Sequence, residues 1–380
     1  MTFLSMPSAN RFQWPAVLAV LFLAAACRPA DPEPQLSIAT EADAGTEYTP
    51  GDAEAPPWLN PLSASINEID ADMPGRFGVY VRRLGPDAGS LDLGDGRAWY
   101  LSSTIKVPVA IAVLEQVDAG SLSLDQELEL AETDFVDGAG DMLTHQPGER
   151  FSIATLLEKS LRDSDSTATD MLIRHMGEVD LNRRIRDWLG RGFGQITTIQ
   201  QVRHDAYGDL HPGVRKLSSG DMLQVQQAGD GEARLNALAD MLGVERDALD
   251  APDIEEVFNR YYDTGTNSAP LEMFANMLEM LVSGELLSPE STALMLEHMR
   301  AITTGGRRIQ AGLPPGADFA QKTGTQVARA CNVGVINPER VDDGDATIVV
   351  ACAEEFDDIA DAERAFQALG RKLAEAGLAL

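Results

Sequence analysis

Ser103 and Lys106 lie three residues apart in the segment Ser103-Thr104-Ile105-Lys106. On a helix, residues at this spacing share a face, so the serine hydroxyl and the lysine amine would meet one turn from each other. A serine hydroxyl is a weak nucleophile until a nearby base takes its proton, and burial can lower the pKa of a lysine enough to make it that base. The spacing alone is weak support, because serine and lysine often occur three residues apart on helices.

A second polar triplet, Ser164-Asp165-Ser166, follows an apolar helical run that ends at Leu161. The Ser164 hydroxyl could relay a proton between lysines and a leaving atom, and Ser166 could hydrogen-bond a substrate. A plainer interpretation is a helix cap, since Ser and Asp are preferred at helix starts and the following residues keep helical spacing. Taken alone, the triplet favours the cap.

A third segment, Lys322-Thr323-Gly324-Thr325, lies late in the chain at the edge of a predicted strand. Lys322 supplies positive charge for a substrate carboxylate and for tuning the serine site, and Gly324 lets the backbone lie close to its neighbours. The backbone N–H of Thr325 could stabilise negative charge on an acyl oxygen, as could that of Ser103 at a helix start. A substrate laid along this edge would extend the sheet.

Apolar patterns place these three segments in a mixed framework. Predicted strands lie near both ends of the folded part, with a block of helices between them. This order indicates the α+β class, with an antiparallel sheet formed from both termini, flanking helices and an all-helical subdomain. The predicted strands span residues 77–82, 98–101, 319–323, 332–336 and 346–351, and the helical regions span 104–117, 152–176, 271–299 and 361–376. Residues 200–266 form a less regular excursion, which we expect to carry its own short helices.

The three segments occur in the order seen in β-lactamases and penicillin-binding proteins. From about Phe77 to its C-terminus the chain resembles the class A β-lactamase branch of that family, and the likeness includes residues 147–149 and 283–288. The resemblance implies a β-lactamase/transpeptidase-like fold. It also implies an active-site-serine hydrolase that forms a covalent acyl-enzyme with β-lactams or related acyl and peptide substrates.

The resemblance implies a role for each matching side chain. Ser103 attacks the acyl carbon, Lys106 and Ser164 move protons, and Lys322 and Thr323 hold the substrate carboxylate. Gly324 and Thr325 complete the substrate-binding edge. Arg308 lies fourteen residues before Lys322, where some relatives carry an additional carboxylate-binding arginine, and Arg329 is a second candidate. Both arginines could instead be ordinary surface charges, which is the interpretation we favour.

The chain departs from the class A pattern after the Ser-Asp loop. Class A enzymes carry a glutamate about 36 residues beyond that loop, in a Glu-x-x-x-Asn segment, and this glutamate activates the water that frees the acyl-enzyme. The corresponding stretch here, residues 199–207, has no glutamate. His204 and Asp205 are candidate replacements and Asp209 is a further nearby carboxylate, although such residues are more often loop or capping residues.

A second departure is Ser166, where the family pattern has an asparagine that can both donate and accept hydrogen bonds. These changes leave the acylation apparatus intact and put fast deacylation in doubt. Losing a water-activating base costs roughly two to four orders of magnitude in rate.

Composition limits the partners. Acidic residues outnumber basic ones 60 to 30, and the formal net charge of -30 repels phosphate backbones, so we expect no nucleic acid partner. The five histidines show no close ligand spacing, so we expect no metal, and no motif implies a cofactor. The expected partner is a small-molecule β-lactam or a peptidoglycan-peptide-like substrate, and we expect a monomer.

The N-terminal region has the pattern of an export signal, with an apolar run from Trp14 to Ala26. The run is too short to span a hydrocarbon core of about 30 Å as a helix. Cys27 follows small residues and resembles the lipidated cysteine of a lipoprotein, with ordinary cleavage nearby as the alternative. Residues 28–57 read as a tether and 58–380 as the hydrolase domain. We expect an exported protein, periplasmic or held in the cell envelope, that meets a membrane only through a lipid anchor at Cys27.

Cys331 and Cys352 lie on two strand-like runs joined by a turn rich in Pro, Asp and Gly. Hairpin pairing would bring them opposite each other. An exported protein favours a disulfide, whereas two buried free thiols remain an equal alternative.

Three functions therefore compete. The first is β-lactam hydrolysis, with the missing glutamate replaced by another group. The second is a D-Ala-D-Ala-type peptidase or an esterase that acts on cell-wall-like substrates and is merely acylated by penicillin. The third is a non-catalytic envelope binding lipoprotein, which the intact Ser-x-x-Lys and Lys-Thr-Gly segments disfavour because a binder needs no nucleophile beside a base.

Overall fold

A computed structural model describes residues 55–85 and 88–379. The predicted export signal, Cys27 and most of the predicted tether lie outside the described residues. Within the described part of the chain, no helix combines the length and apolar character that a membrane span requires.

The central element is a five-stranded antiparallel sheet with strand order β2-β1-β9-β8-β7. Its strands come from both ends of the described chain, as the apolar patterns predict. They are β1 (Arg76–Arg83), β2 (Gly89–Asp92), β7 (Phe319–Gln326), β8 (Arg329–Ile336) and β9 (Thr347–Glu354). Every residue of β8 and β9 is buried, and β7 forms one edge of the sheet.

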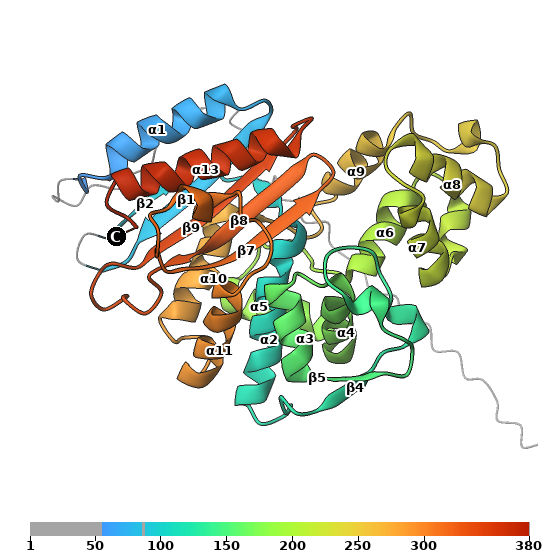
Figure 1. Cartoon of the computed structure of the whole chain (residues 1–380), viewed down its shortest axis with the longest axis horizontal. Coiled ribbons are helices and arrows are strands. Elements are labelled where there is room, and N and C mark those ends of the chain that lie inside the picture. Colours follow the sequence, from blue (N-terminus) through green and yellow to red (C-terminus); the bar gives the residue numbers. More distant parts are fainter. Residues whose placement is uncertain (1–54, 86–87, 380) are drawn as a thin grey trace, which may run out of the picture. The chain divides into compact units, whose positions relative to one another are not determined.

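Helices cover both faces of this sheet (Figure 1). One face packs against α1 (Leu59–Asp72) and α13 (Ile359–Glu375), where Phe77 of β1 meets Phe366 of α13 edge-on at 5.3 Å between ring centroids. The alternate residue Tyr80 belongs to the core on the other face, because successive strand side chains point to opposite sides. That second core is built mainly by α2 (Lys106–Asp118), α3 (Ile153–Arg162), α4 (Ser166–Met176), α5 (Glu178–Leu189), α10 (Leu271–Val282) and α11 (Pro289–Arg300).

Two short sheets lie outside the central one. The predicted strand at 98–101 exists as β3 (Ala98–Tyr100), but it pairs with β6 (Ser268–Pro270) and not with the central sheet. The other pair is β4 (Glu127–Glu129) with β5 (Arg150–Ser152). The β3–β6 pair matters for the site, since β3 leads directly into the segment that carries Ser103.

The excursion between residues 199 and 266 carries its own short helices, as predicted. These are α6 (Ile199–Gly208), the 3₁₀ helix η4 (Pro212–Lys216), α7 (Ser219–Gln227), α8 (Glu232–Leu242) and α9 (Ile254–Tyr262). They enclose a separate hydrophobic cluster, in which Tyr207 of α6 packs edge-on against Phe258 of α9. A core of its own allows this segment to hold a defined structure beside the central sheet and its helices.

Cys331 and Cys352 form a disulfide between β8 and β9, which decides between the two alternatives left by the sequence. They lie directly opposite each other in the strand register, with Cα atoms 4.1 Å apart. The closed loop spans 21 residues.

Removing this disulfide by the double substitution Cys331→Ala and Cys352→Ala should lower the free energy of unfolding by about 3 kcal/mol, because the unfolded chain regains its loop entropy. Urea denaturation of the oxidised protein, the reduced protein and the double variant measures the change. Equal denaturation midpoints for all three would contradict it.

Candidate active site

Ser103 lies in a tight 3₁₀ turn, η1 (Ser102–Ile105), and not in the α-helix itself, which begins at Lys106. The Leu101 carbonyl holds this turn by accepting from the Thr104 backbone N–H at 3.1 Å and from its hydroxyl at 2.7 Å. Ser102 has a φ of 49°, a conformation that costs energy for a residue with a side chain. The turn keeps Ser103 only half buried, while Lys106 on the next turn is fully buried.

The Lys106 amine is directed at the Ser-Asp loop between α3 and α4. It donates to the Ser164 carbonyl, to the Ser164 hydroxyl at 3.2 Å and to the Ser166 hydroxyl at 3.5 Å. Burial lowers the pKa of Lys106 to about 8, and the negative charges of Asp165 and Asp170 only partly oppose this effect. An amine in this range is a base near neutral pH.

A second buried lysine reaches the same hydroxyl from β7. The Lys322 amine donates to the Ser164 hydroxyl at 2.8 Å and to the Thr323 carbonyl at 2.9 Å. Burial lowers the pKa of Lys322 well below its usual value, and the neighbouring charges of Lys106 and Arg308 lower it further. The Ser164 hydroxyl therefore bridges two amines that lie 58 and 158 residues away in sequence.

Asp165 performs the capping role that the plainer interpretation gave to the triplet. Its carboxylate accepts from the backbone N–H groups of Ala168 and Met142, both at 2.9 Å. Asp165 therefore caps α4 and also fixes the turn that begins at Met142. The cap interpretation is therefore confirmed for Asp165. Ser164 faces the two lysines, and its role as a proton relay stays a prediction.

Sequence reasoning missed Asp170, a fully buried carboxylate on α4. It accepts from the backbone N–H groups of Ile199 at 2.7 Å and Gln200 at 2.8 Å, and burial raises its pKa to about 6. The available signal was an acidic residue next to the apolar run 171–173 on a predicted helix. Asp170 thus fixes the first turn of α6 beside the cluster that contains Lys106.

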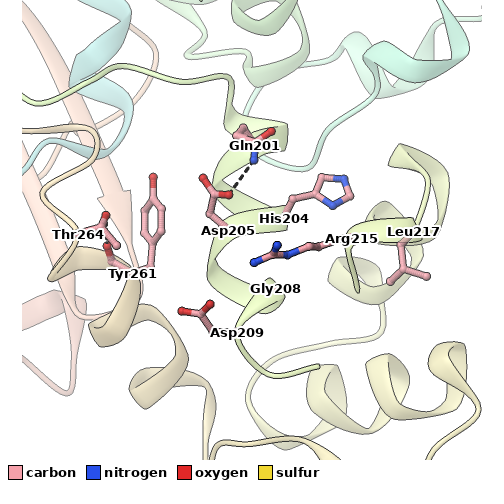
Figure 2. Close-up of a pocket in the computed structure, with 9 residues that line it drawn as sticks. All are labelled: Gln201, His204, Asp205, Gly208, Asp209, Arg215, Leu217, Tyr261 and Thr264. Atoms are coloured by element: carbon pink, nitrogen blue, oxygen red, sulfur yellow. Dashed lines mark hydrogen bonds between the residues drawn. The ribbon is translucent and has the colours of Figure 1, made fainter. Parts of the chain in front are cut away.

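Gln200 is the residue 36 positions beyond Ser164. Its side chain is buried, and its amide nitrogen lies 3.1 Å from Nε2 of His204, one helical turn later. His204 and Asp205 line a separate cavity that none of Ser103, Lys106, Ser164 or Lys322 lines (Figure 2). Their assignment to deacylation stays a prediction.

Gly324 allows β7 to pass very close to the nucleophile turn. A Cβ at this position would lie 2.6 Å from the Leu101 carbonyl oxygen and 2.8 Å from the Ser103 backbone nitrogen. Only a glycine avoids these contacts with backbone atoms.

Gly324→Ala should therefore push the strand away from Ser103. We expect the free energy of unfolding to fall by about 1 to 3 kcal/mol and the acylation rate to fall with it. Thermal unfolding and intact mass after β-lactam exposure report the two effects. Gly306→Ala is the matched control, because a Cβ there meets no atom within 4 Å. Wild-type behaviour of both variants would contradict the close approach.

Neither candidate arginine is a surface charge, so the interpretation we favoured is wrong for both. Arg308 is 4% exposed, and it donates to the carbonyls of Gly324 at 2.9 Å and Cys331 at 2.8 Å and to the Thr325 hydroxyl at 2.6 Å. Arg329 is 7% exposed and pairs with Glu354. The Phe366 ring of α13 packs against the Arg308 guanidinium, and the Tyr262 ring of α9 packs against that of Arg329, so contacts between segments far apart in sequence bury both groups.

The Thr323 hydroxyl forms a hydrogen bond with the Thr304 hydroxyl, with the two oxygens 2.6 Å apart. Among the described residues, no group of three or more His, Cys, Asp or Glu side chains could hold a metal ion. The chemistry that the site offers is proton transfer around a serine, beside a strand edge that carries positive charge.

Solved structures share this fold. PBP-A superposes with a TM-score of 0.59 at 21% identity, over 84% of this chain and 96% of that chain. A β-lactamase from Xanthomonas campestris pv. campestris gives a TM-score of 0.61 at 20% identity, over 83% and 97%. These likenesses show a β-lactamase/transpeptidase-like fold.

The family model of the β-lactamase enzyme family matches residues 61–376, and the chain belongs to that family. A β-lactamase of Mycobacterium tuberculosis (strain ATCC 25177 / H37Ra) is 27% identical over 276 residues, which cover 72% of each chain. The β-lactamase OXY-1 of Klebsiella oxytoca is 26% identical over 280 residues, covering 73% of this chain and 77% of the relative.

Proposed function

We propose that Ser103 forms a covalent acyl-enzyme with β-lactams and that the chain then hydrolyses it. The observation that carries this proposal is the Ser164 hydroxyl bridged between the buried amines of Lys106 and Lys322. Mutual repulsion and burial favour a neutral amine in this pair, and a neutral amine is what a serine nucleophile requires.

The proposed acylation uses the Ser103 hydroxyl and these two amines. Neutral Lys106 takes the proton of the Ser103 hydroxyl as the oxygen attacks the lactam carbonyl. The Ser103–acyl bond forms, and the lactam C–N bond breaks when the tetrahedral intermediate collapses. Ser164 passes a proton from the lysine pair to the departing nitrogen, and the Lys322 amine and the Thr323 hydroxyl hydrogen-bond the substrate carboxylate. The backbone N–H groups of Ser103 and Thr325 stabilise the oxyanion.

Gln200 favours a second candidate, a D-Ala-D-Ala-type peptidase or an esterase that β-lactams acylate without rapid release. A neutral amide cannot take a proton from water as a carboxylate does, so water activation is weak at this position. Among proteins with this fold, a mutant of PBP-A has been solved as an acyl-enzyme complex with penicillin G.

Time-resolved intact mass with a panel of β-lactams tests the proposal, with Ser103→Ala as the control. Hydrolysis predicts an adduct that forms and decays, together with nitrocefin turnover above the control. A stable adduct supports the peptidase or esterase. No adduct with any penicillin, cephalosporin or activated ester would remove both enzymatic functions and favour the binding lipoprotein.

We also propose that the chain is exported and held in the cell envelope through a lipid on Cys27. The apolar run that ends in small residues before Cys27 supports this proposal. Cys27→Ser should move the protein from the membrane fraction to the soluble fraction, because the acyl chains supply the membrane affinity. Fractionation with immunoblotting measures the change, and an unchanged distribution would contradict lipid anchoring.

A further inference from the structure

The helical excursion contains a cavity of about 690 Å³, a size typical of small-molecule sites. Figure 2 shows side chains from three elements around it. The wall residues come from α6 and the residue after it, from η4 and the residue after it, and from α9 and the turn that follows: Gln201, His204, Asp205, Gly208, Asp209, Arg215, Leu217, Tyr261 and Thr264.

The charged groups of this cavity are not matched with one another. Arg215 and Asp209 both line it, yet neither side chain makes a hydrogen bond or an ion pair with any described residue. The Arg215 guanidinium extends into the space between His204 and Asp209 (Figure 2). Asp205 accepts one hydrogen bond, from Gln201 at 2.7 Å, and keeps further acceptor positions. Asp205, Asp209 and Arg215 are exposed, so a ligand can reach this guanidinium and these two carboxylates and displaces at most the Gln201 contact of Asp205.

Such a wall selects against ligands with a single charge. A purely anionic ligand would meet the carboxylates of Asp205 and Asp209, and a purely cationic ligand would meet Arg215. A ligand that carries both charges can form charge-assisted hydrogen bonds with each side. We propose that this cavity binds a short zwitterionic peptide, with its carboxylate at Arg215 and its ammonium group at Asp205 and Asp209.

The α6 wall and the α9 wall of the cavity are both connected to the region around Ser103 by hydrogen bonds. α6 begins at Ile199, and the backbone N–H groups of Ile199 and Gln200 donate to the Asp170 carboxylate. The turn after α9 leads to Asn267, whose carbonyl accepts from the Leu101 backbone N–H at 2.9 Å, two residues before Ser103. The peptide site is therefore an accessory site attached to the acyl site, and its existence does not depend on the proposed function.

Calorimetric titration of the full chain with trialanine tests this assignment. The Ser103→Ala background prevents any acyl transfer from contributing heat. We expect saturable binding at millimolar or lower concentrations. Arg215→Gln and Asp209→Asn should each weaken binding about tenfold, the loss of one charge-assisted contact. Trialanine with an acetylated amine or an amidated carboxylate should lose a similar factor.

Matched controls are Arg186→Gln on α5 and Asp240→Asn on α8, which remove one exposed charge of the same sign elsewhere. They should bind trialanine as the parent does. The peptides with blocked ends give an independent answer if an Arg215 or Asp209 variant fails to fold. Three results would overturn the proposal: no binding at millimolar trialanine, equal binding of free and blocked peptides, or binding to wild-type protein that disappears when penicillin G acylates Ser103.

Discussion

Lys106→Ala is expected to slow acylation of Ser103 by roughly two to four orders of magnitude, the usual contribution of a positioned general base. The substitution removes the amine that donates to both the carbonyl and the hydroxyl of Ser164. Lys322 keeps its contact with Ser164, so the residual rate measures what the second lysine can supply alone. Stopped-flow acylation with nitrocefin measures the change.

The pH dependence tests the same role. Burial lowers the pKa of Lys106 to about 8. The neutral amine is the base, so its fraction rises as the pH rises through that value, and the wild-type acylation rate should rise with it and then level. The acylation rate of Lys106→Ala should not rise over this pH range. Lys372→Ala, on the outer helix α13, is the control and should keep both rate and profile. A Lys106→Ala variant that acylates at the wild-type rate would remove the proposed base.

Gln200→Glu is expected to speed release of the acyl group by roughly two to four orders of magnitude, the gain from adding a water-activating base. The substitution places a carboxylate in the first turn of α6, which Asp170 holds beside the buried lysine cluster. The lifetime of the penicillin adduct, followed by intact mass, is the direct measurement.

Gln224→Glu on α7 is the matched control, because it adds the same charge at an exposed position. It should leave the adduct lifetime unchanged. If Gln200→Glu also leaves the lifetime unchanged while acylation proceeds normally, then Gln200 does not face the acyl carbon. The candidates for deacylation would then be His204 and Asp205, which can be tested in the same assay.

Much of the fold follows from local patterns. The alternation in 319–323 and 332–336 predicts strands that exist as parts of β7 and β8, and the helical spacing of 361–376 predicts α13 within two residues at each end. The pairing of the strands could not be predicted in the same way. The strand at 98–101 pairs with β6, about 170 residues later, because partner choice depends on packing between distant segments.

In the site, as in the fold, local features could be predicted from the sequence and contacts between distant segments could not. The sequence by itself determined the prediction of a serine nucleophile and a lysine base, because Ser103 and Lys106 are spaced one helical turn apart. Only the tertiary structure decided that Lys106 and Lys322 share the hydroxyl of Ser164, and that Asp170 holds Gln200 in place. Burial and the pKa shifts it causes come from segments far apart in the chain, which pack together only after folding.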